Sequence, residues 1–150
     1  MNFNHLAQEQ GFTPSTRVIE LLRLPDNQDC QHFGAGELYC LRRVRTLDSR
    51  PVMYEVIHCE VQRFAKLEQQ VLDGSITEIM STVYGIDIDH EHCVISVTVL
   101  PDQVAAALEK NSGAPCLRIE RARFSKQNQL IDFNLEYWLH DAIEMLVDGR

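Results

Sequence analysis

The sequence predicts an α+β fold in which an antiparallel β-sheet is flanked by helices. Two pairs of β-rich segments, 38–47 with 52–59 and 116–125 with 130–139, are each joined by a short polar stretch, as strands are in β-hairpins. These short connections cannot join parallel strands, which need a crossover of about a dozen residues or more. Segments with helical signals alternate with the strand pairs, and this order favours an α+β fold.

The N-terminal part of the chain predicts a helix followed by a strand. Residues 3–10 have the pattern of a short amphipathic helix that ends at Gly11. Residues 17–24 are rich in β-forming side chains and stop at Pro25, which lacks the N–H group that a strand ladder uses. After the first strand pair, residues 60–72 have a mixed pattern that is helical in part.

Between the two strand pairs, the sequence predicts a helix, a strand and a second helix. Residues 75–84 begin with a Ser-x-x-Glu capping box and stop at Gly85, which are the start and stop signals of a helix. Residues 86–100 are β-rich, and residues 102–110 contain a run of alanines, which favours a helix. The tail, residues 141–147, is short and has an ambiguous pattern.

Length and charge exclude several classes of protein. The chain has 150 residues, no linker, and no apolar run of the roughly 20 residues that cross a bilayer, so we expect one domain over residues 1–150 and no membrane contact. Its start has neither a basic nor an apolar signal region, which indicates a cytoplasmic protein. The net charge is −8 without any basic run, so phosphate backbones should repel this chain and it is not expected to bind DNA alone.

The cysteines and histidines predict no metal site and no cofactor. Five cysteines are scattered along the chain without a Cys-x-x-Cys pair, which favours free thiols over a disulfide framework. In the stretch His90-Glu91-His92-Cys93, strand alternation places both histidines on one face and the cysteine on the other. This arrangement does not assemble a zinc ligand set.

The first hairpin carries the clearest candidate for a binding site. Arg43 and Arg45 share one strand face, and a turn at residues 48–50 would place Arg43 opposite Glu55 and Arg45 opposite Met53. One interpretation is an ordinary cross-strand ion pair on a solvated face. The other is a pair of guanidinium groups that binds a phosphate or carboxylate, with the glutamate accepting ligand hydroxyls.

Two further patterns bear on this site. The helix that begins at Ser75 presents unpaired N–H groups in its first turn, which either bind an anion or simply form a good N-cap. The second hairpin repeats the Arg-x-Arg pattern as Arg121 and Arg123, offset by 78 residues from Arg43 and Arg45. This repeat suggests an internal duplication.

Four segments in this order resemble the UTRA domain, the effector-binding and dimerisation module of HutC-type regulators in the GntR group. They read "GFTPSTRVIELLRLP", "LYCLRRVRTLDSRPVMYEVIHC", "GSITEIMSTVYGIDID" and "GAPCLRIERARFSKQNQLIDFNLEYW". The resemblance runs from about Asn4 to Met145 and implies a chorismate lyase-like fold with a ligand cleft between two halves.

The resemblance also implies a ligand, which is a small anionic metabolite such as a sugar phosphate or an organic acid. The family's Ser-Leu-Tyr helix start is Ser-Ile-Thr in this chain, and its Tyr-Arg-x-Asp-x-Tyr ending is Trp-Leu-His-Asp-Ala-Ile. Both kinds of ligand therefore stay open. The predicted ligand-binding residues are Arg43, Arg45, Glu55, Ser75, Thr77, Ser15, Thr16, Glu136 and Trp138.

The function expected from this resemblance is ligand sensing within a transcriptional regulator. A homodimer would transmit binding to winged-helix DNA-binding domains, which do not precede Asn4 in this chain. No enzymatic activity is expected, because the sequence offers no nucleophile beside a base, no metal set and no glycine-rich phosphate loop. The alternatives are a chorismate lyase-like enzyme with Glu55 as its acid, and a dimerisation module without a ligand.

Overall fold

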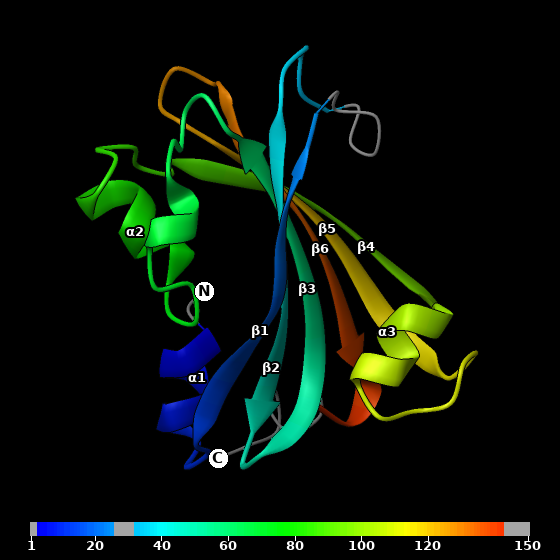
Figure 1. Cartoon of the computed structure of the whole chain (residues 1–150). Helices are drawn as coiled ribbons and strands as arrows, with labels where there is room; N and C mark the ends of the chain where they lie inside the picture. The colour runs from blue at the N-terminus through cyan, green and yellow to red at the C-terminus, as the bar shows by residue number, and fades with distance from the viewer. Residues whose placement is uncertain (1–2, 26–31, 143–150) are drawn as a thin grey trace.

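Six strands form one antiparallel sheet in the computed structural model of the chain, which describes residues 3–25 and 32–142 (Figure 1). The strand order is β1-β2-β3-β6-β5-β4. The strands are β1 Pro14–Leu24, β2 Leu38–Leu47, β3 Arg50–Glu60, β4 His90–Val99, β5 Pro115–Phe124 and β6 Leu130–Leu139. The helices are α1 Phe3–Glu9, α2 Ile76–Thr82, α3 Asp102–Ala107 and a short 3-10 helix, η1 Leu67–Gln69. The predicted α+β class with an antiparallel sheet is confirmed.

The observed elements differ from the predicted ones at their ends. In the β-rich run 86–100 only β4 is a strand, and α3 stops three residues before the expected position 110. Helix α2 begins after its N-cap Ser75, whose Oγ accepts the backbone N–H of Glu78 at 3.1 Å, as the predicted capping box requires. Within the described residues, the Glu78 carboxylate does not make the return hydrogen bond of a complete capping box. The tail beyond residue 142 lies outside the described residues.

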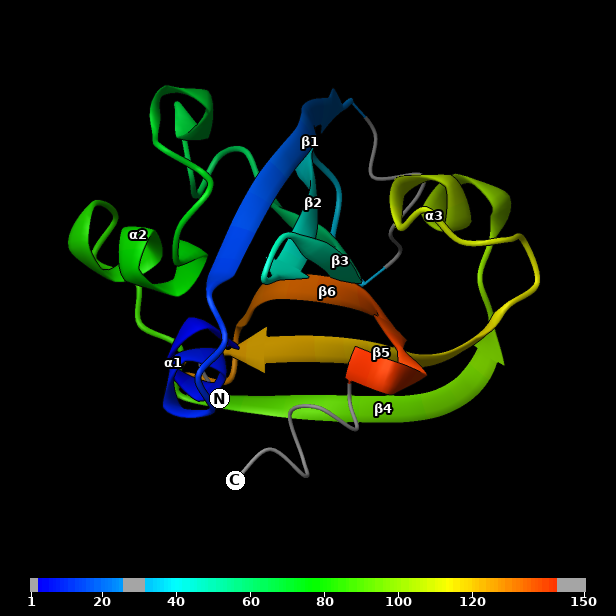
Figure 2. The same ribbon diagram turned by 90° about the horizontal axis from the view of Figure 1, so that it is seen from below.

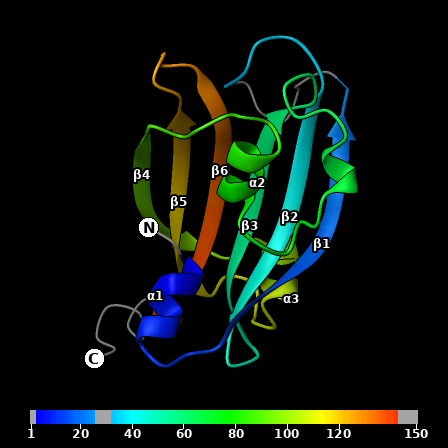
Figure 3. The ribbon, with the colours of Figure 1, turned by 90° about the vertical axis from the view of Figure 1, so that its left-hand side faces the viewer.

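The sheet consists of two similar halves that meet at β3 and β6. Strands β1, β2 and β3 follow one another from one edge, and β4, β5 and β6 follow one another from the opposite edge (Figure 3). Where the halves meet, Glu55 of β3 lies directly opposite Glu136 of β6. This arrangement agrees with the duplication that the repeated Arg-x-Arg pattern suggests.

The register of the first hairpin is the predicted one. Arg43 pairs with Glu55 and Arg45 pairs with Met53. The predicted three-residue turn is wrong, however, because Leu47 pairs with Arg50 and only Asp48 and Ser49 lie between them.

The turn and a bulge together explain why the register still holds. Asp48 and Ser49 both have positive φ, 49° and 67°, as a type I′ turn requires. The register shifts between Arg45 and Thr46, where one extra residue of β3 enters the ladder. The turn is one residue shorter than predicted, and the bulge adds one residue to β3. The two differences cancel, so Arg43 and Arg45 keep their predicted partners.

Helices cover the two faces of the sheet unequally. Helices α1, η1 and α2 lie over one face, and α3 lies over the other (Figures 2 and 3). Tyr39 and Leu41 of β2 pack with Ile76 and Met80 of α2 in a buried cluster. At the far end of the same face, Phe3 of α1 packs in the main core cluster. Arg43 and Arg45 project from β2 between these two helical covers.

The cysteines within the described residues, Cys40, Cys59, Cys93 and Cys116, are present as thiols, and Cys30 lies outside those residues. Within residues 3–25 and 32–142, no three His, Cys, Asp or Glu side chains are grouped so that they could hold a metal ion. In the same part of the chain, no helix has the length and apolarity that a membrane span requires.

Candidate functional site

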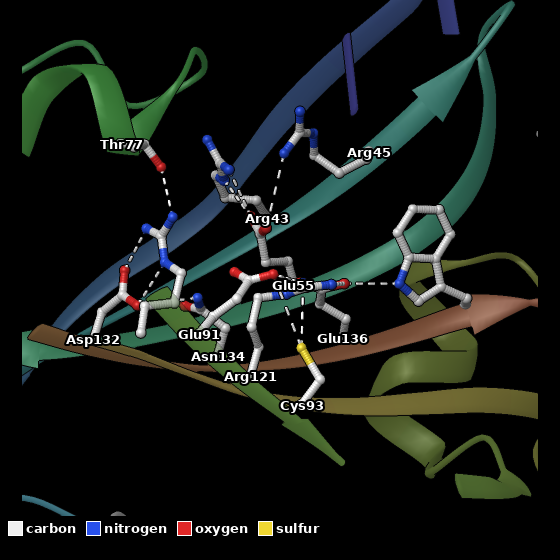
Figure 4. Close-up of polar contacts among 12 residues, drawn as sticks. Arg43, Arg45, Glu55, Thr77, Glu91, Cys93, Arg121, Asp132, Asn134 and Glu136 are labelled. Carbon is white, nitrogen blue, oxygen red and sulfur yellow. Dashed lines mark hydrogen bonds and ion pairs between the residues drawn. The ribbon is translucent and has the colours of Figure 1, made fainter. Parts of the chain in front are cut away.

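A cavity of about 730 Å³ lies on the sheet face that α1 and α2 cover. Its size is within the usual range for small-molecule sites, roughly 300–1,000 Å³. Side chains from α1, α2 and the strands β2 to β6 line it. The four arginines of both repeats, Arg43, Arg45, Arg121 and Arg123, are all among them. The duplicated hairpins therefore direct their arginines into one shared space (Figure 4).

Arg43 connects the sheet to the segment that precedes α2. Its Nε donates to Glu55 Oε1 at 2.7 Å, and its Nη2 lies 2.6 Å from the same oxygen. Its Nη1 donates to the backbone carbonyls of Leu72 and Gly74 at 3.0 and 2.7 Å. All three guanidinium nitrogens are thus engaged within the protein, and the residue is only 3% exposed.

Arg45 has much weaker partners than Arg43. Its Nη1 lies 3.8 Å from Glu55 Oε2, which is too long for a hydrogen bond, and its Nη2 donates to Asn4 Oδ1 at 3.2 Å. Its Nε is buried without a hydrogen-bond partner among the described residues. The guanidinium carbon lies 4.6 Å from the centre of the Phe3 ring. Burial in this apolar setting lowers the pKa of Arg45.

Arg121 is held by two carboxylates. Its Nε and Nη2 donate to the two oxygens of Glu136 at 3.0 and 3.3 Å, which is a bidentate pair. Its Nη1 donates to Glu91 Oε1 at 2.6 Å and contacts Cys93 Sγ at 3.5 Å. Burial alone would lower the pKa of Arg121, but the hydrogen bonds and charge of Glu136 outweigh burial and raise it.

Arg123 is held in the same bidentate way. Its Nε and Nη2 donate to the two oxygens of Asp132 at 2.8 and 2.6 Å, and its Nη1 donates to Thr77 Oγ1 of α2 at 2.6 Å. Hydrogen bonds and attraction from Asp132 offset the effect of burial and raise the pKa of Arg123. Arg43 and Arg123 therefore fasten the α2 region to the sheet from two sides of the cavity.

Glu55 and Glu136 occupy the middle of the cavity floor, where the two halves of the sheet meet. Glu136 also accepts the indole N–H of Trp138 at 2.9 Å. Because each glutamate has an arginine partner, their opposition across the strands does not leave two unbalanced charges.

Carboxylates outnumber arginines around the cavity. Four arginines face five carboxylates, so the lining carries one more negative than positive charge. The cavity is therefore not the open cationic site that Arg43 and Arg45 alone suggest. The five carboxylates are Glu55, Glu78, Asp87, Glu91 and Glu136.

The structure brings most of the predicted site residues together. The predicted residues that line the cavity are Arg43, Arg45, Glu55, Ser75, Thr77, Glu136 and Trp138. Ser15 and Thr16 of β1 are not among the lining residues. Ser15 pairs with Thr46 and shares a hydrogen bond with it, which places Ser15 on the opposite sheet face from Arg45. Thr16 pairs with Arg45 and lies on the arginine face, but on the edge strand beside the cavity.

The lining residues that were not predicted as part of the site include four polar side chains of the second half of the sheet: Arg121, Arg123, Glu91 and Asn134. Arg121 and Arg123 could have been found from the repeat, because they are the counterparts of Arg43 and Arg45 in the second hairpin. Glu91 and Asn134 had no such signal, because only the pairing of β4, β5 and β6 brings them beside Arg121.

The start of α2 works as a cap in this structure. Ser75 Oγ is engaged with the N–H of Glu78, and the carboxylate of Glu78 itself lines the cavity. We expect Ser75→Ala to lower the free energy of unfolding by about 0.5–2 kcal/mol, because it leaves that N–H group without its partner. Urea denaturation would measure this change. Ser75→Thr retains the hydroxyl and should stay close to wild type; equal loss in both variants would contradict the capping role.

Comparison with known proteins places the chain in a family. A family model described as the UTRA domain matches residues 9–144. An uncharacterized HTH-type transcriptional regulator of Escherichia coli K12, YihL, is 20% identical over 152 residues, which covers 98% of this chain and 64% of YihL. This chain therefore spans less than two thirds of that regulator's length.

Solved structures agree with this fold. The crystal structure of PhnF from Mycobacterium smegmatis superposes with a TM-score of 0.87 at 18% identity, covering 94% of this chain and 64% of PhnF. The separate structure of the PhnF effector domain gives a TM-score of 0.83 at 18% identity, covering 93% of this chain and 88% of that domain. The family model matches most of the sequence, and the chain therefore belongs to the UTRA domain family.

Proposed function

We propose that this chain is the sensing domain of a HutC-type transcriptional regulator and that it binds a small anionic metabolite in the cavity between α1, α2 and the sheet. The observation that carries this proposal is the state of Arg45, a buried guanidinium in the cavity wall whose Nε has no partner among the described residues. A buried cation without full compensation is costly, and an anionic ligand would supply the missing interaction.

The assignment of the anion to Arg45 follows from the partners of the other three arginines. Arg121 and Arg123 each hold a carboxylate in bidentate geometry. Arg43 uses all three nitrogens on Glu55 and two backbone carbonyls. An anion at Arg43, Arg121 or Arg123 would have to displace a strong protein partner, whereas an anion at Arg45 competes only with the 3.2 Å hydrogen bond to Asn4 and the 3.8 Å contact with Glu55.

The regulatory part of the proposal concerns a homodimer in the cytoplasm that passes ligand binding to winged-helix DNA-binding domains elsewhere in the regulator. In this view DNA is contacted only through those domains. YihL, whose match covers 98% of this chain, is described as an HTH-type transcriptional regulator. This supports a regulatory role over chorismate lyase-like catalysis.

Strand β4 is the proposed dimer edge, and a second copy of this chain is its partner. Residues 93–99 include no charged side chain, while Val97 on this strand is 80% exposed. The other edge strand, β1, carries Arg17, Glu20 and Arg23. A long uncharged edge pairs readily with its own copy around a two-fold axis, because no like charges oppose one another.

Strand β4 also connects the ligand cavity to the proposed dimer edge. Glu91 and Cys93 of β4 contact Arg121, which lines the cavity. A ligand that changes the position of Arg121 would therefore change the edge strand directly. The dimer interface and the cavity then share one strand.

We expect Val97→Lys to weaken homodimerisation at least tenfold, because it introduces a charge at the centre of the proposed edge and opposes its copy across the two-fold axis. Sedimentation velocity over a concentration series would measure the dissociation constant. Val71→Lys is the matched control, since Val71 is 76% exposed and lies outside every strand. A dimer equally strong in both variants would exclude β4 as the interface.

Isothermal titration calorimetry tests the ligand-binding part. The panel comprises sugar phosphates, phosphonates, short organic acids and urocanate-like acids, and the expected result is a dissociation constant of about 1 mM or tighter for at least one class. Lack of binding by the whole panel would favour the alternative of a dimerisation module without a ligand. Pyruvate release from chorismate, if observed, would instead favour the enzyme.

A further inference from the structure

Two buried polar atoms of the cavity wall lack hydrogen-bond partners among the described residues. They are Nε of Arg45, a donor, and Oδ1 of Asn134, an acceptor. Asn134 is 5% exposed and Arg45 is 7% exposed, so water reaches either side chain poorly. Such orphaned groups are uncommon in native proteins, and at a cavity wall they indicate which groups a ligand presents.

The orientation of the Asn134 amide follows from its neighbour. Its Nδ2 donates to Asp132 Oδ1 at 3.2 Å, and a carboxylate oxygen can accept but not donate. The amide oxygen is therefore the atom that remains without a partner, and it needs a donor from the ligand. Arg45 needs the opposite, which is an acceptor.

The neighbourhood of Asn134 adds further acceptors. Asn134 of β6 pairs with Arg121 of β5. Glu91 of β4 pairs with Arg123, on the same sheet face, and accepts a hydrogen bond from Arg121 at 2.6 Å. Glu91 interacts through Oε1, and its Oε2 has no hydrogen bond or ion pair with the described residues. The Glu78 carboxylate on α2, also in the lining, has no such partner within the described residues either.

We propose that the effector is zwitterionic, with an anionic group at Arg45 and a protonated amine at Asn134 Oδ1 and Glu91. This inference rests on the proposed function, since it assumes that the cavity is the effector site. It goes further by naming the second pole of the ligand. The cavity would then bind a negative group at one end and a positive group at the other.

Charge balance selects an amine over the hydroxyls of an uncharged polyol group. The lining already has five carboxylates against four arginines, so a purely anionic ligand would add negative charge to a partly desolvated space that has an excess of it. An ammonium group brings three donors and no acceptor, which matches a region of carboxylates and an amide oxygen. In a zwitterion its positive charge offsets the negative charge of the anionic group, so the ligand adds less negative charge to this space than an amine-free anion would.

Calorimetry with matched probes tests this proposal on the whole chain. Three pairs differ by one amine: γ-aminobutyrate with butyrate, 2-aminoethylphosphonate with ethylphosphonate, and glucosamine 6-phosphate with glucose 6-phosphate. We expect the amine-bearing member to bind at least tenfold more tightly in each pair that binds. Equal or tighter binding of the amine-free members overturns the zwitterion while leaving the anion site intact. No binding by any probe overturns the cavity as the effector site, and the zwitterion with it.

A variant then locates the amine. Glu91→Gln keeps the shape of the side chain and removes its charge, and we expect it to reduce the ratio of affinities between the amine-bearing and amine-free members of each pair at least fivefold. Glu120→Gln is the matched control, because Glu120 lies on the opposite face of β5 and pairs with Arg118. An unchanged preference in Glu91→Gln would overturn the placement of the amine at this end of the cavity.

Discussion

Replacing Arg43 with alanine is expected to lower the free energy of unfolding by about 3–5 kcal/mol, because the change leaves a buried carboxylate without its cation. Arg43 is 3% exposed and pairs with Glu55, whose own side chain is 10% exposed. The variant also loses both hydrogen bonds to the carbonyls of Leu72 and Gly74, which hold the segment before α2. Chemical denaturation with urea measures the loss.

The control for this prediction is Arg42→Ala. Arg42 is the neighbouring residue on β2, but it faces the other side of the sheet and its contact with Glu20 is partly exposed. We expect a much smaller loss of stability there. The double variant Arg43→Ala with Glu55→Ala should be more stable than the sum of the single losses predicts, because it removes both charges of the pair. A loss at Arg43 no larger than at Arg42 would show that the buried pair does not hold the fold.

Replacing Arg45 with alanine is expected to weaken ligand binding and to change the stability of the fold little, unlike the replacement of Arg43. A hydrogen bond to a charged group contributes about 1.5–3 kcal/mol, so affinity for the best anionic ligand should fall roughly 10- to 150-fold. The fold should lose little, since Arg45 has only weak partners in the protein: one 3.2 Å hydrogen bond to Asn4, one 3.8 Å contact with Glu55 and the Phe3 ring at 4.6 Å. Calorimetry and urea denaturation of the same variant measure both effects.

Arg45→Lys helps to separate charge from geometry. Lysine keeps the positive charge but has no planar guanidinium and no Nε donor in that position, so it should recover only part of the affinity. The matched control is again Arg42→Ala, which removes an arginine from the same strand without touching the cavity lining. Unchanged affinity in Arg45→Ala would remove the physical basis for an anion site in this cavity.

Local sequence pattern predicted the positions of Arg43 and Arg45 but not their roles. Strand alternation placed Arg43 and Arg45 on one face, and the pairing of Arg43 with Glu55 was predicted correctly from the hairpin alone. Their different roles could not be predicted in that way. Arg43 meets carbonyls 29 and 31 residues away, and Arg45 meets a side chain 41 residues away, so tertiary contacts decide which guanidinium is saturated.

The prediction for Ser15 and Thr16 illustrates the same limit. It rested on resemblance to a family and on nearness along the chain to the first strand. In the structure that strand is β1 at the sheet edge, where Ser15 faces away from the arginines and Thr16 lies beside the cavity. Position within a sheet depends on strand order, which local sequence does not encode.

The amino-acid pattern by itself determined the fold class, the two hairpins, the cap of α2 and the common face of each arginine pair, because these depend on neighbours within about a dozen residues. Only the tertiary structure decided that both arginine pairs share one cavity, and that carboxylates from separate strands saturate some of these cations and leave Arg45 incompletely paired. The physical reason is that the charge balance of a buried site depends on every strand and helix that contributes to its wall, and strand order brings these together from distant parts of the chain.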